Sequence, residues 1–158
     1  MLKVNGWQPE MNECFGLIFL LDRRLEAIFD RILAPENLTA KQWLVLAAVG
    51  SILKGKPSIQ EVARQLSTSH QNVKAIALNL EKRGFLLLEK DRKDKRITRL
   101  SITAQSEVLW KVREDIDKAN LVELFKRLSD EEVLLLKQTL FKLMDGAEEM
   151  AERIDREK

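Results

Sequence analysis

The most informative segment of the chain covers residues 58–84 and reads SIQEVARQLSTSHQNVKAIALNLEKRG. Ser58 followed by Glu61 is the pattern of a reciprocal helix cap, in which each side chain accepts a hydrogen bond from the backbone N–H of the other residue. This pattern predicts a short helix over residues 59–66. The three small hydroxyl residues that follow, STS, predict a turn before the next helix begins.

A second helix is predicted after Ser69, whose hydroxyl is placed to cap it. Its apolar residues recur at the spacing of one helical face, and they are Val73, Ile76, Ala77 and Leu80. Gly84 then supplies the left-handed conformation in which many helices end. Residues 58–84 therefore predict a helix, a short turn and a second helix.

The period of the sequence changes after Gly84. Residues 85–90, FLLLEK, and 97–102, ITRLSI, are rich in residues that favour strands, and DRKDKR between them is typical of a hairpin loop. From Lys90 to Arg99 there are six basic residues and two aspartates, so this segment carries +4 while the whole chain carries only +2. Such a loop must project into solvent, where its concentrated charge favours contact with a polyanion.

Long amphipathic helices are predicted on both sides of this region, over residues 11–33 and 130–154. Another helix over residues 40–53 follows the break at Pro35, with Thr39 as its cap, and a further one covers residues 103–128. The outer helices are too long for the central unit to cover. Their apolar stripes need a partner, so we expect a symmetric homodimer.

The composition, with 45% hydrophobic and 33% charged residues in 158, is that of one compact soluble protein. The sequence has no apolar run of membrane-spanning length, and the first residues, MLKVNGWQPEMNE, lack the pattern of a signal peptide, so a cytoplasmic location is expected. One cysteine and one histidine predict no disulfide, no metal site and no cofactor. We find no catalytic motif and expect no enzyme.

Residues 38–109 resemble the winged helix-turn-helix core of the MarR family of bacterial and archaeal transcription regulators. The resemblance is carried by LTAKQWLVL, by SIQEVARQLSTSHQNVKAIALNLEKRGFL and by DRKDKR, which is similar to the family's wing motif of Asp, Pro, any residue, Asp, any residue, Arg. The resemblance implies a mainly α fold with a small β-hairpin wing. It also implies a DNA-binding domain at residues 37–103 and a helical dimerisation region formed by residues 1–36 and 104–158.

The function that the resemblance implies is that of a transcription regulator, a repressor that binds a palindromic operator in double-stranded DNA as a homodimer. In the family, the second helix of the helix-turn-helix enters the major groove, while an arginine oriented by an aspartate enters the minor groove. That pair corresponds here to Asp94 and Arg96. The residues expected to contact DNA are Ser67, Thr68, Ser69, His70, Gln71, Asn72, Lys74, Arg92, Lys93, Asp94, Lys95 and Arg96.

Plainer interpretations exist for each group of residues taken alone. Short polar residues at a helix start often only cap it, and charges at a hairpin tip often only face water. A protein-interaction module that keeps the winged helix as a scaffold is a further alternative, although it has no need of a charged wing. The chain departs from the family pattern in having Arg92 for the wing proline, Ser106 for a glycine, Ala75 for an arginine and Leu78 for an outward polar residue, so base preference does not carry over.

Two routes for a regulatory signal are also implied. Cys14 is placed like the reactive cysteine of the family's organic-hydroperoxide-sensing branch, but the chain has no tyrosine to activate a thiol, and an inert apolar cysteine is the favoured interpretation. The other route is a small aromatic or phenolic effector between the dimerisation helices and the winged domain. Trp43, Trp110 and the phenylalanines of the first helix are candidates to line that site, with a place in the core as the alternative.

Overall fold

The chain folds as two compact units, Met1–Val108 and Leu109–Lys158, in a computed structural model that describes residues 6–157. Residues 1–5 and 158 belong to the expected dimerisation region, and residues 1–5 begin the stretch compared with a signal peptide; they lie outside the described residues. The division between the units falls inside helix α5 (Ala104–Phe125).

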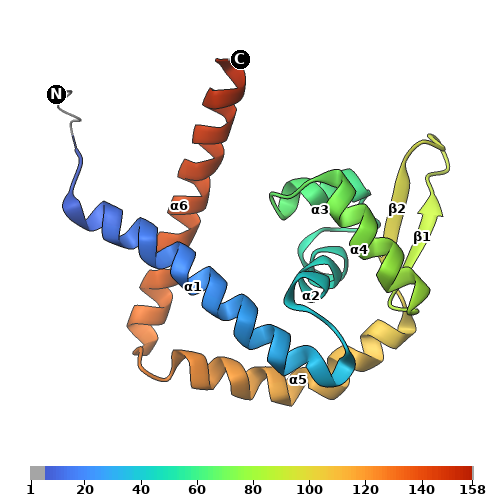
Figure 1. Ribbon diagram of the computed structural model, residues 1–158, viewed down its shortest axis with the longest axis horizontal. Coiled ribbons are helices and arrows are strands. Elements are labelled where there is room, and N and C mark those ends of the chain that lie inside the picture. The colour runs from blue at the N-terminus through green and yellow to red at the C-terminus, as the bar shows by residue number, and fades with distance from the viewer. Residues whose placement is uncertain (1–5, 158) are drawn as a thin grey trace. The chain divides into compact units, whose positions relative to one another are not determined.

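The first unit holds helices, two short irregular turns of helix and one hairpin (Figure 1). In chain order these are α1 (Pro9–Leu33), a 3-10 turn (Ala34–Glu36), α2 (Ala40–Ala47), a π turn (Ala48–Ile52), α3 (Ile59–Gln65), α4 (His70–Lys82), β1 (Leu86–Lys90) and β2 (Thr98–Ile102). α2 packs on α1 and on α4, while α4 also packs on α3 and on β1. The prediction of a mainly α fold with a small hairpin is confirmed.

The predicted helix caps are all present in the first unit. The Thr39 hydroxyl accepts from the backbone N–H of Gln42 at 3.2 Å, and the Gln42 side chain accepts in return from the Thr39 N–H at 3.0 Å. Ser58 and Glu61 make the same reciprocal pair, at 3.1 and 2.6 Å. Ser69 caps α4 by accepting from the Asn72 N–H at 3.1 Å. These local bonds satisfy N–H groups that have no partner inside the helix, so they fix where each helix begins.

Left-handed residues end α3 and α4. Ser67 has φ of 48°, and Thr68 donates its N–H to the Ala63 carbonyl at 3.0 Å, which closes the turn of the helix-turn-helix. Gly84 has φ of 80°, and a Cβ at this position would lie 2.6 Å from Oε1 of Gln105. The positive φ therefore favours glycine there, and any larger residue would also require the Gln105 side chain to move.

The core of the first unit draws one or two side chains from nearly every element. Its largest fully buried side chains are Leu33, Val45, Leu46, Val62, Val73, Leu80, Leu86, Leu100 and Ser106. Because α3, α4 and both strands contribute to the same core, the helix-turn-helix and the hairpin are held in a fixed relation to each other.

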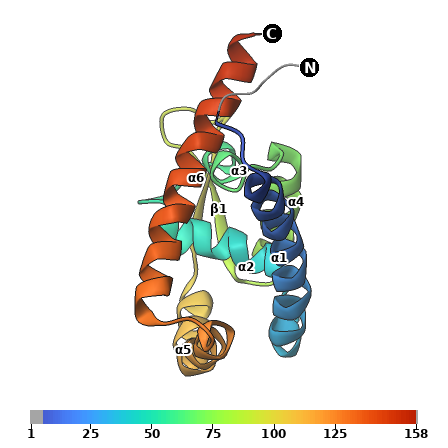
Figure 2. The same cartoon turned by 90° about the vertical axis from the view of Figure 1, so that its left-hand side faces the viewer.

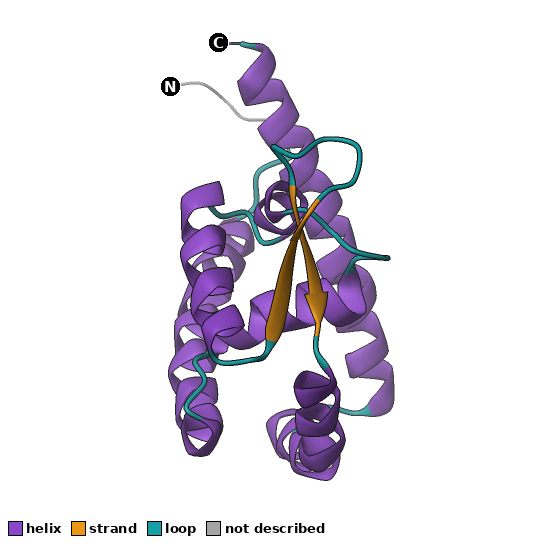
Figure 3. Ribbon diagram, turned by 90° about the vertical axis from the view of Figure 1, so that its right-hand side faces the viewer, coloured by secondary structure: helices purple, strands orange, loops and turns teal. Residues whose placement is uncertain are grey.

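The hairpin is antiparallel, with a register that runs from Leu86↔Ile102 to Lys90↔Thr98 (Figure 3). The residues just before α3 attach to it through the Ser58↔Arg99 bridge and through the Leu100 N–H, which donates to the Pro57 carbonyl at 2.8 Å. The wing is therefore anchored at its base to the start of the helix-turn-helix.

Several helix boundaries differ from the sequence prediction, among them the end of α5, which lies at Phe125 rather than at Leu128. α1 begins at Pro9, two positions earlier than expected, because proline suits the first turn of a helix. The helix predicted over residues 40–53 is α-helical only to Ala47 and then widens into the π turn, where the Leu53 N–H donates to the Ala48 carbonyl at 2.9 Å. Apolar spacing does not distinguish these hydrogen-bond patterns, so the sequence could not reveal the change.

The second unit contains the rest of α5 and the long helix α6 (Asp130–Arg156), which the sequence predicted with its cap (Figure 2). Ser129 and Glu132 form that reciprocal cap at 3.2 and 2.8 Å. Over the described residues 109–157, no apolar side chain is buried. Within residues 6–157, no helix has the length and apolar character needed to cross a membrane.

Candidate nucleic-acid interface

The start of α4 displays short polar side chains on the surface of the first unit. Thr68 is half-buried, and the other predicted residues of this segment are exposed, namely Ser67, Ser69, His70, Gln71, Asn72 and Lys74. The capping bond of Ser69 holds the first turn of the helix in place. The structure therefore brings all seven residues to one end of α4, although their side chains take different directions.

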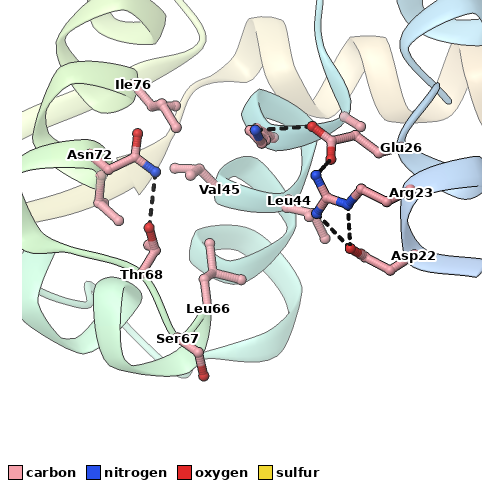
Figure 4. Close-up of a pocket in the computed structure, with 13 residues that line it drawn as sticks. Asp22, Arg23, Glu26, Leu44, Val45, Leu66, Ser67, Thr68, Asn72 and Ile76 are labelled. Carbon is pink, nitrogen blue, oxygen red and sulfur yellow. Dashed lines mark hydrogen bonds and ion pairs between the residues drawn. The ribbon is translucent and has the colours of Figure 1, made fainter. Parts of the chain in front are cut away.

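Asn72 is tied to the turn that precedes α4. Its Nδ2 donates to the Thr68 hydroxyl at 3.0 Å, on the side of α4 that faces α2 (Figure 4). Both side chains line a cavity there rather than the outward surface of the helix. Their hydrogen bond stiffens the junction between the turn and α4, and this is the contact that the structure shows for the Asn72 side chain.

A groove lies between α4 and the hairpin, with a volume of about 560 Å³. Five basic side chains line it, together with the single acidic residue Glu61. The basic residues are His70, Lys74, Lys90, Arg96 and Arg99. Since Glu61 is already bound to Arg99 at 3.0 Å, the groove presents mainly positive charge. It has the charge that a phosphate backbone passing between a helix and a wing would require.

The tip of the wing is a tight loop organised by Asp94. Both oxygens of its carboxylate accept from the Arg96 guanidinium, from Nε and from Nη2 at 3.1 Å each, and Oδ1 also accepts from the Arg96 N–H at 2.9 Å. These hydrogen bonds, led by the one from the Arg96 side chain, lower the pKa of Asp94. The predicted pairing of the two residues is present, and the Arg96 side chain is 91% exposed.

Three further basic side chains surround this pair. Arg92, Lys93 and Lys95 are exposed, whereas Asp94 is half-buried. The wing thus holds one aspartate inward and its cations outward, as a contact with a polyanion requires.

Asp91 and Arg99 form the base of the wing, and no local sequence pattern indicated their roles. The Asp91 carboxylate accepts from the N–H groups of Lys93 and Asp94 at 2.8 and 3.0 Å and from Nε of Arg99 at 2.9 Å. The Asp94 N–H, then Arg99, then the Lys93 N–H lower the pKa of Asp91 to about 2. Asp91 is therefore a fixed anion that shapes the loop.

Arg99 also reaches the helix-turn-helix. Its Nη1 lies 3.0 Å from Oε2 of Glu61 and 3.4 Å from the Lys56 carbonyl. Glu61 is the same residue that caps α3, and the Ser58 backbone N–H is the largest cause of its lowered pKa. One arginine therefore links the wing to the first turn of α3. A cap pattern revealed Glu61, but no local pattern could have paired it with Arg99.

A second cavity, of about 280 Å³, lies within the first unit between α1, α2 and the start of α4. Arg23 and Lys41 pair there with the two oxygens of Glu26, at 2.8 and 3.0 Å (Figure 4). None of the residues that line it is aromatic. Trp43, a candidate for such a lining, instead packs against Phe29 with ring centroids 6.4 Å apart.

Cys14 is exposed near the start of α1. The structure therefore does not bury this thiol in the core of the single chain. That this thiol is inert toward peroxides stays a prediction, with a redox sensor as the alternative, to be checked by titrating the thiol and DNA affinity together.

Comparison with known proteins supports the interpretation of the fold. Residues 36–97 match the model of the MarR family. The transcriptional activatory protein BadR of Rhodopseudomonas palustris is 27% identical over 103 residues, which cover 64% of this chain and 58% of BadR. The match thus spans less than two thirds of that relative.

Solved structures share the fold at low sequence identity. A MarR/EmrR family transcriptional regulator from Acinetobacter sp. ADP1 superposes with a TM-score of 0.76 at 16% identity, over 87% of this chain and 96% of that one. MepR of S. aureus, solved in a complex with DNA, gives a TM-score of 0.70 at 20% identity, over 83% and 95% of the two chains.

The helix-turn-helix, the hairpin and the basic groove between them define a winged helix-turn-helix protein. The match of residues 36–97 to the MarR family model and the likeness to solved MarR-type structures agree with this fold. This family consists of transcription regulators rather than enzymes, in agreement with the prediction from the sequence.

Proposed function

We propose that this protein is a transcription regulator that binds a palindromic operator in double-stranded DNA as a homodimer. α4 enters the major groove and the wing enters the adjacent minor groove. The DNA-binding domain is assigned to residues 37–103, and dimerisation to residues 1–36 and 104–158. Such a regulator acts in the cytoplasm, where it meets chromosomal DNA.

The observation that carries this proposal is the basic groove between α4 and the wing. Its cations come from both elements, so a single sugar-phosphate backbone lying in it would contact Lys74 on one side and Arg96 on the other. The structures of MepR and of Streptococcus pneumoniae FabT, both determined with DNA, share this fold. A scaffold for protein partners would not require this distribution of charge.

The test is binding to DNA from the promoter upstream of the protein's own gene, measured across a salt series for the wild type and Arg96→Ala. Lys142→Ala is the matched control, since it removes one exposed positive charge from α6. We expect Arg96→Ala to weaken specific binding and to reduce the slope of log K against log salt by about one, with no change for the control.

Two other outcomes would count against the proposal. Equal losses of DNA affinity in Arg96→Ala and Lys142→Ala would indicate a general electrostatic attraction between protein and DNA rather than a contact made by the wing. If neither promoter DNA nor any duplex selected from a random pool binds better than random sequence, the alternative of a protein-interaction scaffold is favoured.

Dimerisation is proposed because exposed apolar side chains line both outer helices. On α1 they include Phe15, Leu17 and Phe19, and on α6 they include Leu136, Leu140 and Leu143. Burial of these surfaces against a second copy would be favourable. A two-fold axis would then present two copies of α4 to half-sites about 34 to 36 Å apart, one turn of DNA.

Repression is the direction of regulation that we propose, and removal of the gene should then raise transcription from a reporter under its operator. The relative from R. palustris is named as a transcriptional activatory protein, so activation is the alternative direction. Lower transcription on removal would mean that this protein activates.

A small aromatic or phenolic effector is proposed to bind in the cavity between α1, α2 and α4. An acidic ligand there would compete with Glu26 for Arg23 and Lys41, and it would lie against Thr68 and Asn72 at the start of α4. Such a ligand could shift the spacing of the two recognition helices in the dimer. Hydroxybenzoates should therefore weaken operator binding by the wild type more than by Lys41→Gln.

A further inference from the structure

The outward line of α4 has an unusual composition for a surface that faces DNA. Residues at spacings of four, three and four lie on the same side of a helix, and here they are Gln71, Ala75, Leu78 and Lys82. All four are exposed. The middle of the line is apolar, and the Leu78 side chain, 48% exposed, is its largest member.

The remaining sides of α4 are occupied by other contacts. Val73, Ala77 and Leu80 lie in the core. Asn79 hydrogen-bonds Gln42 of α2 at 3.1 Å, on the side shared with Asn72, while Lys74 faces the groove beside the wing. The line from Gln71 to Lys82 is therefore the part of α4 that projects farthest from the protein.

The chemistry of this line is selective among base pairs. In the major groove, thymine alone carries an apolar group, its C5 methyl, and alanine or larger apolar side chains contact it. Glutamine forms paired hydrogen bonds with N6 and N7 of adenine. Guanine is read most often by arginine or lysine; the outward line contains no arginine, and its single lysine, Lys82, is the last residue of α4.

We propose that the outward line of α4 reads A·T base pairs, with Ala75 and Leu78 against thymine methyl groups and Gln71 hydrogen-bonded to adenine. This inference rests on the proposed function, since it requires α4 to enter the major groove. Leu78 is the principal specificity residue, because its side chain reaches farthest and buries most apolar area on contact.

The test replaces thymine by deoxyuridine, one position at a time, in a half-site obtained by selecting bound duplexes from a random pool. Deoxyuridine lacks the methyl group but keeps every hydrogen-bonding group of the base. We expect the selected half-site to contain A·T pairs in its major-groove segment. At one or more of its thymines the wild type should lose affinity about fourfold, which corresponds to about 0.8 kcal/mol for one buried methyl group.

Leu78→Ala should bind the thymine and deoxyuridine duplexes equally at the position that Leu78 reads. Leu87→Ala is the matched control, since Leu87 is 46% exposed but lies on β1, and it should keep the wild-type preference for thymine. Leu78→Gln serves as a second variant, with thermal melting to show that both variants are folded.

The possible failures are distinguishable. If the wild type binds its selected site but is indifferent to deoxyuridine at every thymine, or if Leu78→Ala keeps the full preference, the inference is overturned while the proposed function stands. If the wild type selects no sequence at all, the proposed function fails and the inference falls with it.

Discussion

Arg96 and Arg99 lie three positions apart but have different surroundings. The Arg96 side chain is 91% exposed and pairs only within the loop, whereas the Arg99 side chain is 30% exposed and spans two carboxylates. Its Nε binds Asp91 and its Nη1 binds Glu61. Arg96 is therefore available to DNA, while Arg99 positions the wing that carries it.

Replacement of Arg99 by lysine should loosen the wing. Lysine offers one nitrogen where arginine offers a rigid fork, so it cannot keep both carboxylates in place. The N–H groups of Asp91 and Ile97, which donate to carbonyls within the loop at 3.0 Å, should exchange with solvent faster in Arg99→Lys, as measured by NMR. Arg96→Lys is the control and should leave these exchange rates unchanged. Equally faster exchange in both variants would contradict the assignment of different roles to Arg96 and Arg99.

The ionisation of Asp91 should make the wing sensitive to acid. Its pKa in the folded protein is about 2, below the ordinary value of 3.8. A lowered folded-state pKa contributes stability that is fully present above the unfolded value and is lost as pH falls toward the folded one. The unfolding free-energy difference between wild type and Asp91→Asn should therefore be constant above about pH 4 and shrink toward pH 2. A carboxyl-carbon NMR titration of Asp91 centred near 3.8 would refute this.

Residues that act through near neighbours were predictable from the sequence, and residues that act at a distance were not. Ser58 and Glu61 lie three positions apart, so their cap is a local pattern. Glu61 and Arg99 are separated by 38 positions, and only the folded hairpin brings them together. The hydrogen bond between Thr68 and Asn72 is an exception, since it is local and still was not predicted, because each of these side chains has other possible partners within the same turn.

The cap of α3 connects the helix-turn-helix to the wing. Ser58 is buried, caps α3 together with Glu61, and forms a bridge with Arg99 of β2. α3 has only 7 residues and depends on its cap more than a long helix does. The start of this helix is thus one of the points that fix the wing.

Loss of this cap should destabilise the first unit. Ser58→Ala removes the acceptor for the Glu61 N–H and is expected to lower the free energy of unfolding by about 1 kcal/mol. Ser51→Ala, at an exposed position in the π turn, should change it by less than about 0.5 kcal/mol. Urea unfolding measures the free energy of unfolding of both variants. An equal change in Ser58→Ala and Ser51→Ala would mean that the cap contributes no measurable stability.

Elements were predictable where composition changes sharply, as at Gly84, where helical spacing gives way to strand-forming residues. The groove between α4 and β2 could not be predicted from the sequence, since it depends on how the hairpin packs against α4. The charge of the wing segment pointed only to the basic residues on the hairpin side of the groove. The contribution of Lys74 followed from the family resemblance, and that of Lys90 became clear only in three dimensions.

The second unit lacks a buried apolar core, which a stable isolated fold needs. No apolar side chain is buried in its described residues, 109–157, and an apolar groove of about 300 Å³ lies between the end of α5 and α6. Phe125, Leu136 and Leu140 are among the residues that line it. Helices gain most of their stability from packing of an apolar face, so this unit is expected to be stable only with a partner.

A charge in this groove should therefore separate the proposed dimer. In Leu140→Glu the new carboxylate would have to be buried without a partner, a cost of several kcal/mol. We expect the variant to sediment as a monomer and to bind an operator with two half-sites no better than one with a single half-site. Gln138→Glu adds the same charge two residues away, on the opposite side of α6, and should remain dimeric with full operator affinity. A dimeric Leu140→Glu would exclude this face of α6 from the interface and would leave the apolar surface of α1 as the place to look for it.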